Sequence, residues 1–399
     1  MWRAEAPHVL AALLRRSGDI EACEDAVQEA LVAAAEQWPR DGQPDNPRAW
    51  LIRVASRRHI DQRRSDAARA QRELRASSLE PADREDAAAP GASELDDTLQ
   101  MLTLCCHPAL SAHAQVALTL RAVAGLTTAQ IAAGFLVPEA TMAQRISRAK
   151  RALKAAGARF GAPTMTDLPQ RLHAVRHVLY LTFNEGHTAS AGSALVDTTL
   201  AGEAIRLAER LHRAVPDDTE TTGLLALMLL TDARAPARID EYGDLVPLAE
   251  QDRTQWDGEK ITRGTALVEE ALPTGLVGPF QIQAAIAAVH GEAPTSQETD
   301  WLQITMLYRM LDELAPSPVV SLNLAIAVGM AHGPAAGLDA LEPLLQSADQ
   351  QRNHRLHAAH GHLLELAGDP EGARTAYRLA AGLTHSIPEQ RYLNRRARD

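Results

Sequence analysis

The chain has 399 residues, of which 46% are hydrophobic and 4% aromatic, and it carries a formal net charge of -11. Its length suffices for two or three domains, and its many Ala and Leu residues favour helices over sheets, so an all-α fold class is predicted. Three cysteines, two of them adjacent, exclude a disulfide framework, and the absence of a long apolar stretch predicts a cytoplasmic protein with no membrane contact.

The charge is unevenly distributed along the chain. Residues 1–166 hold 21 Lys and Arg against 20 Asp and Glu, and the remaining residues hold 19 against 31. The net charges of these two stretches are therefore +1 and -12, so the acidic character belongs to the C-terminal stretch. Within residues 1–166 an acidic segment separates two basic ones, a pattern that suggests two DNA contacts joined by a spacer.

Residues 8–38 predict two helices, separated by Gly18 and Asp19. The second helix should end at Trp38 and Pro39. It should display a row of acidic and amide side chains, which are Glu24, Asp25, Gln28 and Glu29. Such a face is most often simply solvated, and a contact with a protein partner is the alternative.

A long helix should begin at Pro47, with Asn46 as its cap. His59 is predicted to face solvent. The apolar face of this helix should consist of Trp50, Leu51, Val54 and Ile60. The polar side chains that project elsewhere are Arg53, Arg57, Arg58, Gln62, Arg63 and Arg64. The pattern predicts an N-terminal helical domain of residues 1–75 with one strongly basic helix.

Residues 76–97 show no hydrophobic periodicity and are rich in Pro, Gly and acidic residues, which predicts an acidic linker. A second helical domain of residues 98–162 should follow it. In that domain residues 126–153 predict two short helices around a tight turn. The apolar face of the second helix consists of Met142, Ile146, Ala149 and Leu153. The polar side chains left on its other faces are Thr141, Gln144, Arg145, Arg148 and Arg151.

This pattern is typical of a helix-turn-helix that presents its second helix to a DNA major groove. The simpler alternative is an amphipathic hairpin with a solvated basic face. No acidic residue occurs between Ala140 and Thr166, so the basic residues there would repel one another without phosphates to neutralise them. The absence of acidic residues therefore favours a DNA-binding helix-turn-helix over a hairpin with a solvated face.

These segments resemble regions of bacterial sigma factors of the sigma-70 family, in their extracytoplasmic-function (ECF) class. Residues 24–30, Glu-Asp-Ala-Val-Gln-Glu-Ala, resemble region 2.2. Residues 46–64, Asn-Pro-Arg-Ala-Trp-Leu-Ile-Arg-Val-Ala-Ser-Arg-Arg-His-Ile-Asp-Gln-Arg-Arg, resemble regions 2.3 and 2.4. The helix-turn-helix of residues 126–153 resembles region 4.2, with Leu136 where the general pattern has a turn glycine.

The resemblance implies a transcription initiation factor whose partners are promoter DNA and core RNA polymerase, bound at its beta-prime clamp helices and beta flap. It implies that the acidic row from Glu24 to Glu29 contacts polymerase. It further implies that Asn46 and the polar residues of the basic helix hold the melted minus-ten element, with residues 38–46 as a base pocket. The exposed residues from Thr141 to Arg151 would read the minus-35 element.

Residues 167–399 predict an extension of paired helices. Second helices recur near Trp301, Ala335 and Pro370, and first helices near Val319 and Asn353, which is close to the tetratricopeptide (TPR) period. Residues 179–187 are similar to a signature of the extension in ECF group 42. The motif residues of this extension are Asn184, Glu185, Gly186, Trp256 and Asp257. The resemblance implies regulation in cis and a groove for a protein or peptide ligand.

No catalytic residues, metal site or cofactor are predicted. Cys105, Cys106 and His107 lack a second pair at zinc spacing, and the histidines from His354 to His362 are poorly spaced for one metal centre. Asn184-Glu185-Gly186 is expected to be a helix C-cap followed by a buried polar contact, and Trp256 the anchor of a long loop. The rival function is a dimeric helix-turn-helix regulator with a ligand-sensing helical domain, which would not need the basic helix of residues 53–64.

Overall fold

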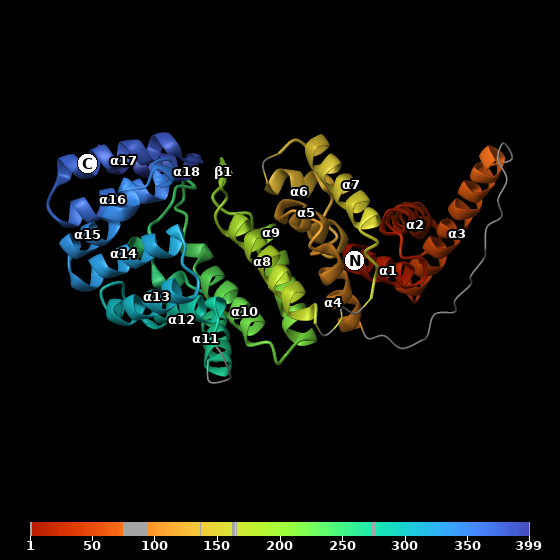
Figure 1. The fold of residues 1–399 in the computed structure, drawn as a ribbon, viewed down its shortest axis with the longest axis horizontal. Coiled ribbons are helices and arrows are strands. Elements are labelled where there is room, and N and C mark those ends of the chain that lie inside the picture. Colours follow the sequence, from red (N-terminus) through yellow and green to blue (C-terminus); the bar gives the residue numbers. More distant parts are fainter. Residues whose placement is uncertain are drawn as a thin grey trace. The chain divides into compact units, whose positions relative to one another are not determined.

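The structure is a computed structural model that describes residues 2–74, 94–135, 137–161, 164, 166–272 and 277–398, without the side chains of 2–4, 65–74 and 94–96. Almost all described elements are helices, so the predicted all-α fold class is confirmed (Figure 1). The chain forms two compact units, one of Met1–Ala133 with Val137–Val178 and the other of Leu179–Asp399 with Gly134–Leu136. Each unit is described by itself.

The first unit is built entirely from helices in its described residues. Their bounds are α1 Trp2–Ser17, α2 Ile20–Asp41, α3 Pro47–Leu74, α4 Glu94–Cys105, α5 Ala112–Ala122, α6 Thr128–Gly134 and α7 Glu139–Ala155, and the unit ends within α8, Leu168–His187. As expected, Gly18 and Asp19 separate α1 from α2. Gly18 has a φ of 70°, and the Asp19 carboxylate accepts hydrogen bonds from the N–H groups of Glu21 (3.1 Å) and Ala22 (3.3 Å).

The end of α2 lies beyond the predicted end. The helix continues through Pro39 to Asp41, and Gly42, with a φ of 82°, closes it by donating its N–H to the carbonyl of Trp38 at 3.1 Å. A proline inside a helix removes one backbone donor, and the left-handed glycine supplies the stop instead. The non-helical loop is therefore residues 42–46, and the expected base pocket of residues 38–46 loses its first four residues to the helix.

The start of α3 was predicted correctly, because the Asn46 side chain accepts a hydrogen bond from the N–H of Ala49 at 2.9 Å. Two predictions for this helix were wrong. His59 is buried, with 7% exposure, and Ile60 is 49% exposed. Leu51, Ala55 and His59 are each four residues apart and line the buried face, whereas Ile60 is turned away from it.

The fourth helix begins inside the stretch that was assigned to the acidic linker. Residues 94–97 are its first turn, and the buried Asp97 carboxylate accepts a hydrogen bond from the Arg15 guanidinium of α1. The rest of the expected linker, the Leu136 departure from the glycine pattern and the domain boundary near residue 163 lie outside the described residues. The domain limits expected from the sequence therefore remain predictions.

The second unit, which we call the extension, contains the end of α8 and the later elements. Their bounds are β1 Ala191–Gly192, α9 Thr198–Ala214, α10 Thr219–Asp232, η1 Ala235–Ala237, η2 Leu248–Glu250, η3 Arg253–Gln255, α11 Gly258–Ala271, α12 Pro279–Glu292, α13 Trp301–Leu314, α14 Pro318–His332, α15 Pro334–Gln346, η4 Ala348–Gln350, α16 His354–Leu366, α17 Pro370–Leu383, β2 His385–Ser386 and α18 Ile387–Arg396. The strands β1 and β2 pair in parallel, with Ala191 beside His385 and Gly192 beside Ser386.

Consecutive helices from α10 to α18 pack on one another, and α14 also contacts α16. Helices begin at Trp301, Pro334 and Pro370, close to the predicted second helices. At one crossing α14 and α15 come very close, since a Cβ on Gly337 would lie 2.7 Å from the Cα of Gly329. The helix pairs are thus present, and their assignment to the TPR type remains a prediction.

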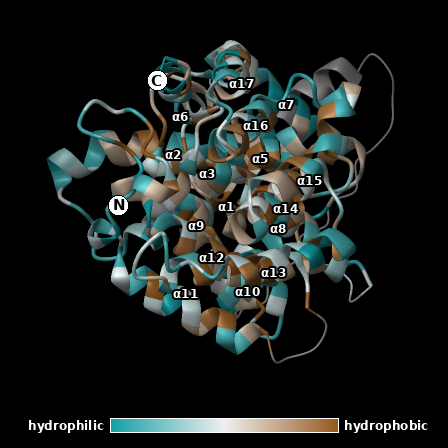
Figure 2. Cartoon of the chain, turned by 90° about the vertical axis from the view of Figure 1, so that its left-hand side faces the viewer, coloured by the Kyte–Doolittle hydropathy of each residue, from teal (hydrophilic) through white to brown (hydrophobic). Residues whose placement is uncertain are grey.

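Many of the helices, such as α9 and α17, have one apolar and one polar face, whereas α10 is buried from Thr221 to Leu230. Figure 2 shows polar and apolar stretches alternating along their ribbons. In the extension the apolar faces form successive clusters, one around Leu230 and Ala284, another around Ile286 and Ile304, and a third around Leu341 and Leu363. Within the described residues no helix combines the length and apolar character that a bilayer crossing requires.

Candidate nucleic-acid interface

The second helix of the predicted helix-turn-helix, α7, has the two faces that the sequence indicated. Its buried residues are Met142, Ile146, Ala149 and Leu153, so that prediction is confirmed. On the other faces Arg145 is half-buried, and the exposed side chains are Thr141, Gln144, Arg148 and Arg151. The apolar face fixes the helix, and the polar side chains are free to bind a ligand.

A groove of about 400 Å³ runs between α7 and the start of α5. Thr141, Gln144, Arg145 and Arg148 line one side of it, and Ser111 stands on the other. Arg145, Arg148 and Arg151 form no ion pair with any described residue. Three guanidinium groups without anionic partners give this face of α7 a strong attraction for phosphates.

The lysines of α7 behave differently, because both are paired with α2 or its cap. The Lys154 ammonium donates to the Asp19 carboxylate at 2.9 Å, and Lys150 pairs with Glu24. Burial acts to raise the pKa of Asp19, but hydrogen bonds from Lys154 and from backbone N–H groups outweigh it and hold that pKa below its usual value. The basic residues of α7 therefore divide into a paired side and an open side.

A second basic surface lies on α3. A shallow groove of about 720 Å³ is lined by Arg53, Arg57 and Arg64, by the exposed Ile60 and by Arg16 of α1. Within the described residues of the chain none of these arginines forms an ion pair, whereas Arg58 lies 3.6 Å from Glu29. Gln62 and Arg63 are exposed on the same helix. Sequence reasoning missed Arg16, which belongs to a helix that carries no other signal for DNA.

The acidic row on α2 is only partly displayed. Asp25, Gln28 and Glu29 are exposed, but Glu24 has 6% exposure, so its predicted display at the surface was wrong. Its carboxylate accepts a hydrogen bond from Nε of Arg121 in α5 at 2.6 Å and pairs with Lys150 of α7. The pattern of α2 alone could not reveal partners that lie about a hundred residues away.

Three of the motif residues of the extension, Asn184, Glu185 and Gly186, lie near the end of α8. Gly186 lies in the last turn of α8, where a Cβ would approach the backbone nitrogen of Ala201 in α9 to 2.4 Å. Close packing requires glycine there, and α8 continues past Gly186 to His187, so the expected C-cap at this motif was wrong. Glu185 accepts hydrogen bonds from the N–H and hydroxyl of Ser190, both at 3.0 Å, and Asn184 accepts one from the N–H of Thr188 through its carbonyl at 2.8 Å.

Trp256 anchors the irregular segment before α11. It is buried, and the Arg253 guanidinium lies 4.6 Å from its ring centre. Asp257 caps α11, because its carboxylate accepts hydrogen bonds from the N–H groups of Glu259 and Lys260, both at 3.1 Å, and these bonds lower the pKa of Asp257. Both residues therefore hold the segment in place.

The cysteines and histidines offer no metal centre among the described residues, where no group of three or more His, Cys, Asp and Glu side chains converges. Cys105 and Cys106 are both fully buried and carry free thiols. Nε2 of His357 donates a hydrogen bond to the carbonyl of Gln351 at 2.8 Å, and His354 lies 3.1 Å from Glu389.

Comparison with known proteins places family matches on both units. Residues 1–69 match Sigma-70 region 2, residues 100–153 match Sigma-70, region 4, and residues 171–272 match a family of unknown function, DUF6596. An uncharacterized protein of Rhizobium meliloti (strain 1021) is 42% identical over 97% of this chain and 92% of its own length. SigI of Mycobacterium tuberculosis, a probable ECF RNA polymerase sigma factor, is 31% identical over 38% of this chain and 52% of its own length.

No solved structure matches the chain. The Rhizobium meliloti relative shares almost the full length, and the two sigma regions occur in the order and at the positions of the two basic helices α3 and α7. The chain therefore carries region 2 and region 4 of the sigma-70 family, and it belongs to one family with its full-length Rhizobium meliloti relative.

Proposed function

We propose that this protein is an ECF sigma factor of the group 42 type, which binds core RNA polymerase, recognises and melts promoters, and is regulated by its own extension. The observation that carries the proposal is the pair of open arginine surfaces on α3 and α7, each backed by a buried apolar face. Two separate DNA contacts on two helical regions suit a factor that binds two promoter elements.

At the minus-35 element, α7 enters the major groove. Thr141, Gln144, Arg145 and Arg148 read base edges, and Arg151 holds a phosphate. Arginine can donate two parallel hydrogen bonds to guanine, and glutamine can pair in the same way with adenine. The groove beside Ser111 gives the DNA backbone room between α5 and α7.

At the minus-ten element, α3 holds the opened strand. Extruding a base costs a few kcal/mol, so the arginine groove must stabilise the displaced phosphates while an apolar surface receives the base. Arg53, Arg57 and Arg64 of the groove and the exposed Arg63 of the same helix supply the charge, and Asn46 at the helix cap ends the loop of residues 42–46. The exposed Ile60 lies in the same groove and offers an apolar contact.

Polymerase binds the exposed residues of the acidic row on α2, which are Asp25, Gln28 and Glu29. Glu24 joins this surface only when its pairs with Arg121 and Lys150 open. The described state is therefore a closed one, in which region 2 and region 4 hold each other, and polymerase binding selects an open state.

The experiment is run-off transcription with core polymerase on genomic promoter fragments. Arg148→Ala should reduce initiation by the equivalent of about 1–3 kcal/mol of promoter affinity, because it removes a base contact. Lys154→Ala is the matched control, since that lysine lies on the paired side of the same helix. Equal loss in both variants would contradict the reading of DNA by the open face of α7.

The same assay, run with the full chain and with a chain that ends at His187, distinguishes a sigma factor from the rival function, a dimeric regulator. If neither form initiates on any fragment while the protein alone shifts specific duplex DNA, the dimeric regulator replaces the sigma factor. The shorter chain retains all of α8, so the comparison of its transcription with that of the full chain gives the sign of regulation by the extension.

A further inference from the structure

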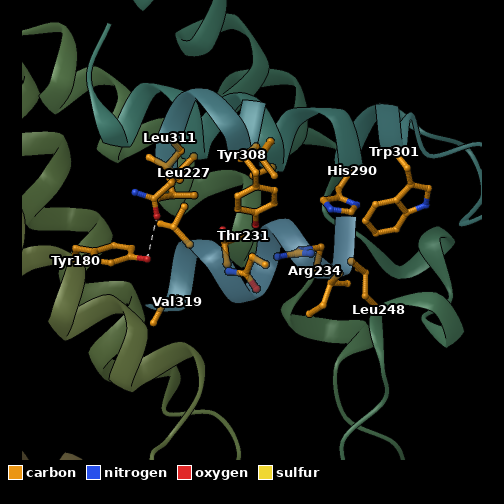
Figure 3. A pocket seen from close by; sticks show the side chains of 16 residues that line it. Tyr180, Leu227, Thr231, Arg234, Leu248, His290, Trp301, Tyr308, Leu311 and Val319 are labelled. Carbon is orange, nitrogen blue, oxygen red and sulfur yellow. Dashed lines mark hydrogen bonds between the residues drawn. The ribbon is translucent and has the colours of Figure 1, made fainter. Parts of the chain in front are cut away.

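A cavity of about 380 Å³ lies within the extension. Helices α8, α10, α12, α13 and α14 and the segment that carries η1 and η2 contribute its walls, as Figure 3 shows. The volume falls in the range of pockets that hold small organic molecules. None of the functions proposed for the sigma regions uses this cavity.

The central polar group of the cavity is the guanidinium of Arg234. No hydrogen bond or ion pair joins it to any residue that the structure describes, and no Asp or Glu lines the cavity. Burial lowers the pKa of Arg234 to about 10, against a smaller opposing effect of the Tyr308 phenol, and the neighbouring Arg253 lowers it further. A cation in this position is costly unless an anion joins it.

Other polar side chains that line the same space have atoms without a partner among the described residues. Nδ1 of His290 is buried and unpaired, and neither the Tyr308 hydroxyl nor the Asn323 amide forms a hydrogen bond there. Burial, with Arg234 and Arg253 nearby, lowers the pKa of His290 to about 3, and burial raises the pKa of Tyr308 to about 12, so both are neutral near pH 7. Figure 3 shows Arg234 between Tyr308 and His290.

Apolar and aromatic side chains make up most of the remaining cavity wall. Leu227, Ile286 and Leu311 line it, and the Trp301 ring packs edge-on against His290 with 5.3 Å between the ring centres. The Tyr180 hydroxyl donates to Gln283 at 3.2 Å, so those two side chains are already satisfied. Tyr308 and His290 therefore lie close to Arg234, and apolar and aromatic side chains line the cavity beside them.

We propose that this cavity binds a small molecule with a carboxylate or phosphate head group and a flat, apolar body. The head group pairs with the guanidinium of Arg234 and accepts hydrogen bonds from Tyr308 and His290. The planar guanidinium fork matches the geometry of both oxyanions. The body of the ligand lies against the apolar and aromatic wall.

The test is calorimetric titration of the full chain with benzoate, phenyl phosphate and benzamide. Benzoate and phenyl phosphate distinguish the two head groups, and benzamide is the neutral counterpart of benzoate. We expect saturable binding of at least one charged probe and at least tenfold weaker binding of benzamide. Arg234→Met should weaken the charged probe at least tenfold. Arg263→Met should leave it unchanged, because Arg263 pairs with Glu209 at the surface.

A second measurement excludes a merely structural role for Arg234. Because its charge has no partner among the described residues, Arg234→Met should retain or raise the Tm of the protein without ligand. A Tm lowered by several degrees would overturn the proposal. So would the absence of saturable binding of both charged probes, or binding that Arg234→Met leaves intact. Neither polymerase nor promoter takes part, so this result is independent of the sigma function.

Discussion

Glu24 is the residue at which contacts of α2, α5 and α7 meet. Its buried carboxylate is shared between the Arg121 guanidinium and the Lys150 ammonium, whose side chains are 17% and 12% exposed. Removing one member of such a buried set leaves the others uncompensated, so each single substitution should be costly. The neighbouring pair of Lys154 with Asp19 is much more exposed, at 67% and 32%, and water screens it.

We therefore predict different coupling energies for the two pairs. A double-mutant cycle of Glu24→Gln and Lys150→Gln should give a coupling of about 1–3 kcal/mol, because the two groups interact away from water. The same cycle of Asp19→Asn and Lys154→Gln should give less than about 1 kcal/mol. Urea unfolding of the four variants of each cycle measures both, and equal couplings would contradict the closed state.

His187 should make the free energy of unfolding depend on pH. Its ring is buried and stacked on Phe183 with 5.5 Å between the ring centres, and Nδ1 has no partner among the described residues. Burial, with a smaller effect of Arg238 and Arg234, lowers the pKa of His187 to about 2. The unfolded chain binds a proton near pH 6.5 and the folded chain does not, so stability falls as the pH drops below 6.5.

The predicted slope is up to about 1.4 kcal/mol per pH unit between roughly pH 6.5 and pH 4.5. In the His187→Gln variant the free energy of unfolding should depend less steeply on pH by this amount, even if the variant is less stable than the wild type at every pH. Unfolding midpoints of the wild type and the variant at about pH 7.5, 5.5 and 4.5, on either side of the ordinary histidine pKa, provide the comparison. Parallel pH profiles would show that folding does not lower the pKa of His187.

At the scale of elements, the close crossing of α14 and α15 depends on glycine. A Cβ on Gly337 would lie 2.7 Å from the Cα of Gly329 and 3.1 Å from the carbonyl oxygen of Ala325, and backbone atoms cannot yield easily. Glycine is otherwise a poor helix former, worse than alanine by about 1 kcal/mol. Close packing therefore outweighs helix propensity at this crossing.

Gly337→Ala should consequently destabilise the extension by about 1–3 kcal/mol through overpacking. Gly202→Ala in α9 is the matched control, because no atom lies within 4 Å of a Cβ at that position. It should stabilise by about 0.5–1 kcal/mol. Thermal unfolding of the two variants should shift in opposite directions. A raised unfolding temperature in both variants would show that helix propensity decides at both sites.

Periodicity within one helix could be predicted from the sequence, and contacts between helices could not. The buried face of α7, the break at Gly18 and Asp19, the cap at Asn46 and the starts of the later helices all follow from residues close together in the chain. His59 and Ile60 are adjacent, so an error of one position exchanged their environments. The burial of Glu24 depends on α5 and α7, and Arg234 meets His290 only through the fold of the extension.

At the scale of the whole molecule, charge should govern DNA affinity. Residues from 167 onwards carry a net charge of -12, while the earlier residues carry +1 and the open arginine surfaces. A chain ending at His187 should bind non-specific duplex DNA more tightly than the full chain at low salt, by about tenfold or more. The difference should shrink as salt shortens the range of electrostatic repulsion.

Fluorescence anisotropy with a labelled duplex between about 50 and 300 mM salt, the range over which screening grows strong, tests this expectation. A difference that does not change with salt would point to direct coverage of the basic surfaces by the extension. An affinity unaffected by truncation would contradict both explanations.

The short parallel pairing of β1 with β2 brings residue 191, near the beginning of the extension, beside residue 385, near its end. Arg391 and Arg395 of α18 add a second link through Asp244, at 3.4 and 3.1 Å. An open array of helix pairs can fray from its last pair inward, because each pair depends only on its neighbours. With its two ends fastened together, the extension resembles a closed ring in its connectivity. Its last helices are thereby coupled to its first, and the extension is expected to lose its structure as one piece.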